Sequence, residues 1–360
     1  MCFFLVSSMQ PYRIAGHLCR TLILALPCLL VAQPLLAEEV LRILTWPGYA
    51  DSDLVQEFAE HYGVRVEVSL VSNDDNLRDK LGNNQGGDYD VFAANTAEIQ
   101  YYIDQELVQP LQASEIPNTK RQLWRFRNLQ SIPGISQGNL AYAIPYTYAE
   151  MGLIYDRQQF SRPPTSLASL WDPAYRGRVL AYDGSSHNYS ITRLLQGQPP
   201  FQIAEQDIPA ASAKLIELRR NVLTFYSLPE ESVSLFREHQ SALLYANYGR
   251  QQFKLLQDAG ADVGYVIPKE GALAWLDCWA ISRGAKNRQL AQDWINFTLE
   301  PRISKELSRR QGLANTLEAP AEGSNLDKLI WLEPVEDAAR RTSLWMRIRS
   351  GDSLSAVLRP

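Results

Sequence analysis

Reactive side chains are sparse in this chain, and their spacing limits the chemistry they could do. Residues 183–187 (DGSSH) bring together an aspartate, two serines and a histidine, the residue types of a hydrolase triad. This segment lacks the Gly-x-Ser-x-Gly turn that exposes a nucleophilic serine, and adjacency in sequence does not produce triad geometry. It therefore indicates a polar helix start, and we expect no enzymatic activity.

The sequence also shows no pattern typical of a metal site, a cofactor site or a reactive thiol. The four histidines do not show the spacing of metal ligands: His17, His61, His187 and His239. No glycine-rich phosphate-binding loop is present. Three of the four cysteines fall in the first thirty residues, which leaves Cys278 in an apolar run. We expect Cys278 to be a buried, inert thiol, and we expect neither a metal nor a cofactor.

The first 37 residues read as a targeting segment. They contain two arginines and no acid, followed by a short apolar run and by Ala37 before two glutamates. This pattern predicts a cleaved secretory signal peptide and hence a periplasmic protein; a retained anchor, a lipoprotein at Cys28 and a start at Met9 are alternatives. Cleavage leaves 323 residues with one cysteine and changes the net charge from -5 to -7. A chain this acidic, without a basic stripe, argues against a nucleic-acid partner.

Strand and helix patterns alternate along the remaining chain, which predicts an α/β protein with largely parallel sheets. Residues 41–46, 64–71 and 89–94 alternate as strands, with a helix between the first two that stops at Gly63. Residues 141–145 and 151–155 read as two separate strands, and residues 203–223 as one long helix. The tail, residues 324–357, reads as mostly helical.

The order of several short motifs resembles the periplasmic solute-binding proteins of the spermidine/putrescine-binding type, and the resemblance covers about residues 40–350. The motifs, in order, are 44–49 (LTWPGY), 89–92 (YDVF), 143–148 (AIPYTY) with 152–155 (GLIY), 170–177 (LWDPAYRG), and 268–271 (PKEG) with 275–277 (WLD). The resemblance implies the type II periplasmic-binding-protein fold, two α/β lobes with a ligand cleft between them. We place lobe one at 38–144 plus 278–320, and lobe two at 145–277 plus 321–360.

In that family, aromatic rings enclose the ligand's methylene chain and carboxylates pair with its ammonium groups. The ligand-binding positions that this implies here are Trp46, Tyr49, Thr96, Asp183, His187, Tyr245, Trp275 and Asp277. Asp277 matches the amine-binding aspartate, and an ammonium facing a desolvated carboxylate makes a strong charge-assisted hydrogen bond. For Trp46, Tyr49, Trp275 and Asp277 the alternative is ordinary packing or a surface ion pair.

Three positions depart from the family's set of acids. Gly48, Gly184 and His187 stand at or near places where polyamine binders carry acidic or polar side chains. A neutral His187 could accept a hydrogen bond from an amine, and a protonated one could bind a carboxylate; the alternative is a histidine bonded within its own turn. Either the ligand carries fewer cationic groups, or acids elsewhere compensate. From these departures we expect a ligand with one amine and a polar or anionic remainder, such as an amino-acid-like solute.

The resemblance implies a protein, expected to be a monomer, that captures a small amine-containing solute, polyamine or amino-acid-like, by lobe closure. Its partner would be the membrane permease of an ABC importer. The alternative is a periplasmic ligand sensor of the same fold that docks on a membrane signalling receptor. In both cases ligand binding shifts an equilibrium between open and closed forms.

Overall fold

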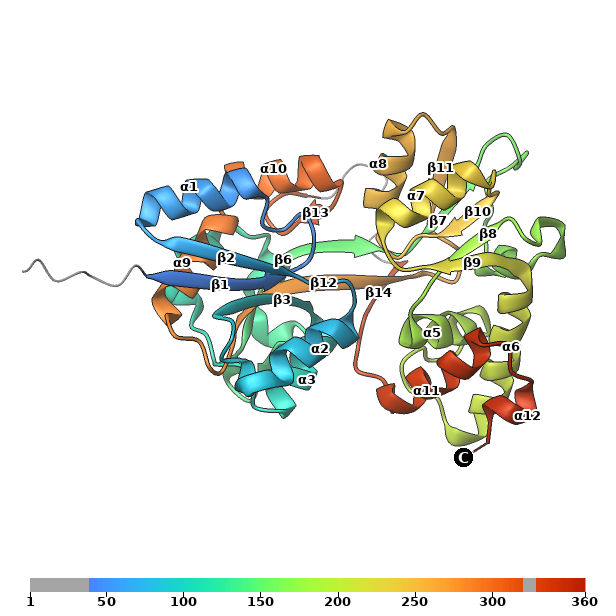
Figure 1. The fold of residues 1–360 in the computed structure, drawn as a ribbon, viewed down its shortest axis with the longest axis horizontal. Coiled ribbons are helices and arrows are strands. Elements are labelled where there is room, and N and C mark those ends of the chain that lie inside the picture. Colours follow the sequence, from blue (N-terminus) through green and yellow to red (C-terminus); the bar gives the residue numbers. More distant parts are fainter. Residues whose placement is uncertain (1–38, 320–327, 360) are drawn as a thin grey trace, which may run out of the picture. The chain divides into compact units, whose positions relative to one another are not determined.

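The protein is described here from a computed structural model, which covers residues 39–319 and 328–359 (Figure 1). The expected signal peptide, its cleavage site and the choice between Met1 and Met9 lie outside these described residues. The described chain builds two mixed β-sheets covered by helices, together with the small hairpin β4 (Ser136–Gln137) and β5 (Leu140–Ala141). The two sheets matter here because both contribute side chains to one pocket.

The first sheet has the strand order β13-β6-β12-β3-β1-β2, with β14 also paired to β12. Its strands are β1 (Val40–Thr45), β2 (Arg65–Leu70), β3 (Val91–Asn95), β6 (Ala143–Glu150), β12 (Ala272–Ile281), β13 (Ala314–Asn315) and β14 (Leu329–Trp331). Strand β1 pairs in parallel with β2 and β3, whereas β12 runs antiparallel to both β3 and β6. All of β3, β6 and β12 is buried, which accounts for their nearly continuous apolar sequences.

The second sheet has the order β11-β7-β10-β8-β9. Its strands are β7 (Leu153–Asp156), β8 (Val179–Tyr182), β9 (Val222–Tyr226), β10 (Leu243–Tyr245) and β11 (Val263–Val266). Strands β8, β9 and β10 are parallel neighbours, whereas β7 is antiparallel to both β10 and β11. The chain passes from the first sheet to the second directly after β6 and returns in β12 (Figure 1).

Helices pack on both sheets. Those associated with the first sheet are α1 (Ser52–Tyr62), α2 (Asp74–Gly82), α3 (Thr96–Asp104), α4 (Trp124–Arg127), α9 (Arg288–Thr298) and α10 (Pro301–Gln311). Those associated with the second are α5 (Ser185–Leu195), α6 (Ile208–Asn221), α7 (Pro229–Glu238), α8 (Arg250–Asp258), α11 (Ala338–Arg349) and α12 (Leu354–Val357). Helix α1 ends as predicted at Gly63, whose φ of 66° is the left-handed conformation that glycine adopts at no steric cost.

Several expected elements differ from the structure. The sheets are mixed rather than largely parallel, because the strands next to each passage between the sheets run antiparallel to their neighbours. The break expected after residue 145 is absent, since β6 continues to Glu150. The long helix expected at 203–223 is the shorter α6 followed directly by β9. The described part of the tail, from residue 328, includes the strand β14, because pairing with β12 overrides its weak local pattern.

Sheet membership also moves the expected lobe boundaries. Residues 145–150 and 272–277, assigned from the sequence to lobe two, pair within the first sheet through β6 and β12. Strand β14, also assigned to lobe two, pairs with β12. On this pairing, we propose a division into two lobes closer to Met151 and Gly271.

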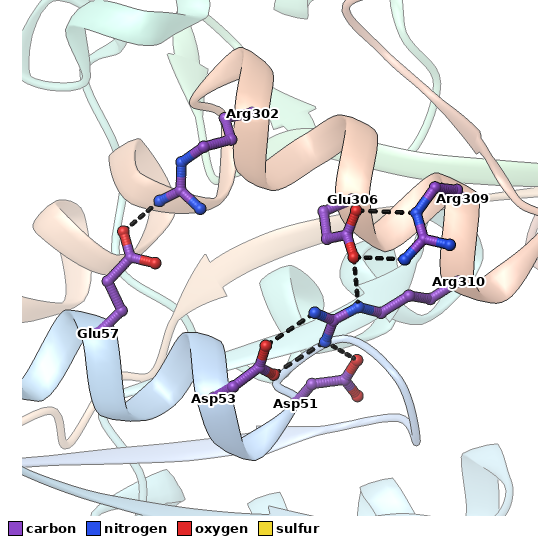
Figure 2. Close-up of polar contacts among 7 residues, drawn as sticks. All are labelled: Asp51, Asp53, Glu57, Arg302, Glu306, Arg309 and Arg310. Atoms are coloured by element: carbon purple, nitrogen blue, oxygen red, sulfur yellow. Dashed lines mark hydrogen bonds and ion pairs between the residues drawn. The ribbon is translucent and has the colours of Figure 1, made fainter.

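An ion-pair network joins α10 to the start of α1 (Figure 2). The Arg310 guanidinium donates to Asp51 at 3.0 Å, to both carboxylate oxygens of Asp53 at 2.8 and 2.7 Å, and to Glu306 at 2.9 Å. A second pair, Arg302 with Glu57, lies further along the same two helices. Because the Arg310–Asp53 pair is bidentate and belongs to a network, this cluster links the end of α10 to the start of α1 more firmly than an isolated surface pair would.

Candidate functional site

One pocket, with about 690 Å³ of open space that is partly continuous with solvent, is lined from both sheets. The first-sheet side contributes Trp46, Pro47, Tyr49, Val71, Ser72, Asp74, Asn95, Trp275, Asp277 and Leu332. The second-sheet side contributes Tyr182, His187, Leu228, Pro229, Asn247, Tyr248 and Gln251. Among these described lining residues, two are acids and none is lysine or arginine.

Asp277 provides a buried carboxylate in the middle of β12, where the pairing with β6 shifts register between Asp277 and Cys278. The side chain is only 6% exposed, and the Tyr49 hydroxyl donates to its Oδ2 at 2.7 Å. Burial raises the pKa of Asp277 to about 7, although the Tyr49 hydrogen bond lowers it in part. Asp277 lies within β12 and lines the pocket.

Two tryptophans are fixed by their ring nitrogens. Trp46 Nε1 donates to the Ala93 carbonyl at 3.1 Å, and Trp275 Nε1 donates to the Asn247 carbonyl at 2.9 Å. Because the polar edge of each ring is already bonded to backbone, the ring surface that borders the pocket is apolar and π-rich. Such faces attract organic cations.

Asp74 is a pocket residue that the sequence analysis missed. It is the first residue of α2, is partly buried, and accepts a hydrogen bond from Asn95 Nδ2 at 3.3 Å. Burial, and then the nearby Glu98 carboxylate, raise the pKa of Asp74 well above its ordinary value. The position of Asp74 in the sequence could have revealed it. The polar run at 72–75 follows β2, at the carboxyl end of a parallel strand, and ligands of such sheets bind at these ends.

His187 lines the pocket from the first turn of α5. Its ring meets the edge of Tyr182, with the ring centres 5.3 Å apart. Burial, helped by the charge of Arg341, lowers the pKa of His187 to about 4. The imidazole is therefore neutral near pH 7 and contributes no positive charge to the pocket.

The two unexpected glycines are explained by their neighbours. A Cβ at Gly48 would lie 2.3 Å from Cδ of Gln311, and the φ of Gly48, +87°, also disfavours any side chain. A Cβ at Gly184 would lie 2.5 Å from the Tyr182 ring and 2.7 Å from Nδ1 of His187. A side chain at Gly48 would strain the backbone and displace the Gln311 amide, and a side chain at Gly184 would require the Tyr182 and His187 rings to shift.

Three expected ligand residues do not line this pocket. Thr96 donates its hydroxyl to the Leu332 carbonyl at 3.0 Å, and Tyr245 is 1% exposed with its hydroxyl directed at the Met151 sulfur. Asp183 accepts from Trp345 Nε1 at 2.8 Å and pairs with Arg349. The polar groups of these three residues bind α11, the core or the segment after β14.

Other chemistries remain without a site in the described part of the chain. Within residues 39–319 and 328–359, no cluster of His, Cys, Asp or Glu could hold a metal ion, and no helix combines the length and apolarity that crossing a membrane requires. A Gly-x-Ser-x-Gly pattern does occur at residues 134–138, but Ser136 lies in hairpin β4–β5 and not in a strand-to-helix turn. Cys278 is fully buried, and burial raises the pKa of its thiol.

Comparison with known proteins matches residues 53–329 to the family described as bacterial extracellular solute-binding protein. The spermidine/putrescine-binding periplasmic protein 1 of Haemophilus influenzae is 26% identical over 84% of this chain and 81% of its own length. The putrescine-binding periplasmic protein PotF of Escherichia coli is 22% identical over 87% and 92%. The TpPotD lipoprotein of Treponema pallidum superposes with a TM-score of 0.76 at 18% identity, covering 87% of this chain and all of that one.

Proposed function

Because this chain belongs to the bacterial extracellular solute-binding proteins, a family of binding proteins and not of enzymes, we propose that it captures a small organic cation in the pocket described above. The observation that carries the proposal is the composition of the pocket wall. Asp74 and Asp277 supply two carboxylates, aromatic rings surround them, and the described lining residues include no lysine or arginine.

The contacts suit a solute with two ammonium groups. An ammonium at Asp277 replaces the proton that burial otherwise favours on this carboxylate, and the low dielectric of the site strengthens the pair. Asp74 offers a second carboxylate on the same wall. Trp46 and Trp275 present apolar, cation-attracting faces that suit the methylene chain and the ammonium ends of a polyamine.

An amino-acid-like solute fits less well. Its carboxylate needs a positively charged partner, and His187, with a pKa of about 4, is neutral at physiological pH. The remaining second-sheet residues of the wall are tyrosines, amides and apolar side chains. A polyamine is therefore favoured over a solute that carries both an amine and a carboxylate.

Closure of the two walls is the proposed capture step. A ligand contacting both sheets stabilises the closed form and shifts the hinge equilibrium, which a membrane partner then reads. Relatives are named as periplasmic polyamine-binding proteins, and a similar solved structure from Listeria monocytogenes is titled as a putative spermidine/putrescine ABC transporter. We propose the same setting here: export by a cleaved signal peptide at residues 1–37, a periplasmic location, and delivery to an ABC permease.

The test is a thermal-shift panel on the chain beginning at Glu38. Putrescine, spermidine and cadaverine should raise Tm in a concentration-dependent way, since a ligand stabilises by RT ln(1 + [L]/Kd), whereas glutamate, glycine and glucose should not. Stabilisation by glutamate or glucose with none by the diamines would contradict the proposal. For the membrane step, deletion of the gene should abolish uptake of the stabilising diamine. Normal uptake with loss of a transcriptional response to the diamine would favour the sensor alternative.

A further inference from the structure

Gln311 joins the helices of the two sheets without lining the pocket. It is the last residue of α10, on the first sheet, and its Oε1 accepts a hydrogen bond at 2.9 Å from Nε2 of Gln251, in the first turn of α8 on the second sheet. Gln251 is 8% exposed and is itself part of the pocket wall. The bond therefore connects a residue outside the pocket to one inside it.

The other side of the Gln311 amide rests on Gly48. The positions that a Cβ at Gly48 would take lie 2.3–2.6 Å from the amide atoms of Gln311, so this close approach is open only to glycine. Gly48 lies between Trp46 and Tyr49, two residues of the first-sheet wall. One amide thus contacts the turn that carries two aromatic pocket residues and also binds a residue of the opposite wall.

Neighbouring contacts set the place of Gln311. Arg310, the preceding residue, is bonded to Asp51 and Asp53 at the start of α1, which positions the end of α10 (Figure 2). Gly312, with a φ of +70°, ends the helix, and a Cβ there would lie 3.2 Å from the Arg250 carbonyl of α8. The end of α10 is therefore held by α1 on one side and packed against the start of α8 on the other.

We propose that Gln311 is a positioning residue for ligand capture. Its amide connects the turn at Gly48 to Gln251 and so favours the closed form, in which the two walls of the pocket face each other. This inference rests on the proposed capture of a ligand between the two walls, but not on which ligand is captured. Because Gln311 touches no ligand, its loss should weaken every ligand by the same factor and leave their ranking unchanged. Gly48 is then the partner that Gln311 requires.

The test compares Gln311→Met, Gln251→Met and the double variant with putrescine as the probe. Methionine keeps the length of glutamine but makes no comparable hydrogen bond. We expect Gln311→Met to raise Kd about 3–10-fold, as for loss of one net hydrogen bond, with equal factors for putrescine and spermidine. The double variant should be no weaker than Gln251→Met alone, because the two residues act through one bond. Gln257→Met, on the exposed face of α8, is the matched control.

Ligand-free scattering separates the two proposals. Small-angle X-ray scattering of unliganded Gln311→Met should give a larger radius of gyration than the wild type, a readout that needs no ligand. The inference would be overturned if Gln311→Met had the radius of gyration of the wild type and a Kd within twofold of it. It would also be overturned if the effects of Gln311→Met and Gln251→Met on the free energy of binding added up in the double variant. If the wild type binds no diamine, the proposed solute fails, and the cycle is repeated with whichever compound of the panel raises Tm; circular dichroism confirms that each variant is folded.

Discussion

The two walls of the pocket differ in charge. Both carboxylates among the described lining residues, Asp74 and Asp277, belong to the first-sheet wall, which also carries Trp46 and Trp275. The second-sheet wall presents tyrosines, amides and a neutral His187, with no charged side chain among its described lining residues. For the proposed cationic ligand, this difference assigns recognition of the charge to the first-sheet wall and covering of the ligand to the second-sheet wall.

The buried ionisable groups of the two walls also respond differently to a cation. Burial favours the neutral form of both Asp277 and His187, raising the pKa of the first and lowering that of the second. A bound ammonium reverses this preference only for Asp277, because a carboxylate gains from a neighbouring positive charge and an imidazolium does not. If the ligand is the proposed cation, its binding should release a proton from the first-sheet wall and none from His187.

Removing the charge of Asp277 should have the largest effect. Asp277→Asn keeps the acceptor for the Tyr49 hydroxyl but leaves a bound ammonium without its buried partner, so Kd for putrescine should rise by about 100-fold or more. The ligand-induced rise in Tm should disappear while the circular dichroism spectrum stays native. His187→Asn on the opposite wall is the control and should change Kd only a few-fold; equal losses in both variants would break the proposed division between the walls.

Removing an aromatic face of the first wall should have the next largest effect. Trp46→Ala deletes a ring that borders the pocket and, as a desolvated cation–π contact, is worth up to about 2 kcal/mol, so Kd should rise by up to about 30-fold by titration calorimetry. Leu228→Ala, at the rim of the second wall, should change Kd less than threefold. A larger loss for Leu228→Ala would mean that covering the ligand matters more than the aromatic contact.

Asp74 should matter only for ligands with a second positive charge. Asp74→Asn should weaken putrescine by about 3–10-fold, because one charge-assisted hydrogen bond at a partly exposed site is lost. Butylamine, with one ammonium, should bind both proteins within twofold. If Asp74→Asn weakened the affinity for the diamine and the monoamine equally, Asp74 would attract cations in general and would not pair with a second ammonium group.

Lowering the pH should produce the smallest change. Putrescine stays doubly protonated, but Asp277, with a pKa of about 7, gains a proton, so affinity should fall about threefold from pH 7.5 to 6.5. Without ligand, Asp277 is protonated more readily in the folded protein than in the unfolded chain, so its own contribution to stability falls as pH rises from about 4 to 7. The lowered pKa of His187 contributes an opposing rise in stability as pH rises from about 4 to 6.5. Asp277→Asn should therefore flatten the pH dependence of affinity and remove the fall in stability, whereas His187→Asn should leave the pH dependence of affinity unchanged and make the fall in stability steeper.

Sequence reasoning reached much of the fold. The α/β class, the helix stop at Gly63 and the strands of the first lobe follow from hydrophobic period and from glycine conformation, which are local properties. The mixed sheets, the length of β6 and strand β14 did not follow, because strand direction and pairing depend on partners far away in the chain. The strand at β14 is only three residues long and carries no pattern of its own.

The candidate site was reached in part for the same reason. Trp46, Tyr49, Trp275 and Asp277 stand in recognisable motifs, and the structure brings them together with His187. Thr96, Asp183 and Tyr245 have suitable types and positions, but each is engaged by a partner outside its own motif. Asp74 was overlooked because an acid at the start of a helix is also an ordinary favourable feature of any helix.

From the sequence alone came the two-lobe α/β family, the residues Trp46, Tyr49, Trp275 and Asp277 of the first wall, and the absence of acids at Gly48 and Gly184. Only the tertiary structure decided why those glycines are there and what replaces the acids. Gln311 lies 263 residues from Gly48 in the chain, yet its amide fills the space above that glycine, and Asp74 reaches the pocket from another element. Which side chain fills a given space, and which way a buried carboxylate points, depend on residues that are packed together from distant parts of the chain. A local sequence pattern therefore cannot predict either one.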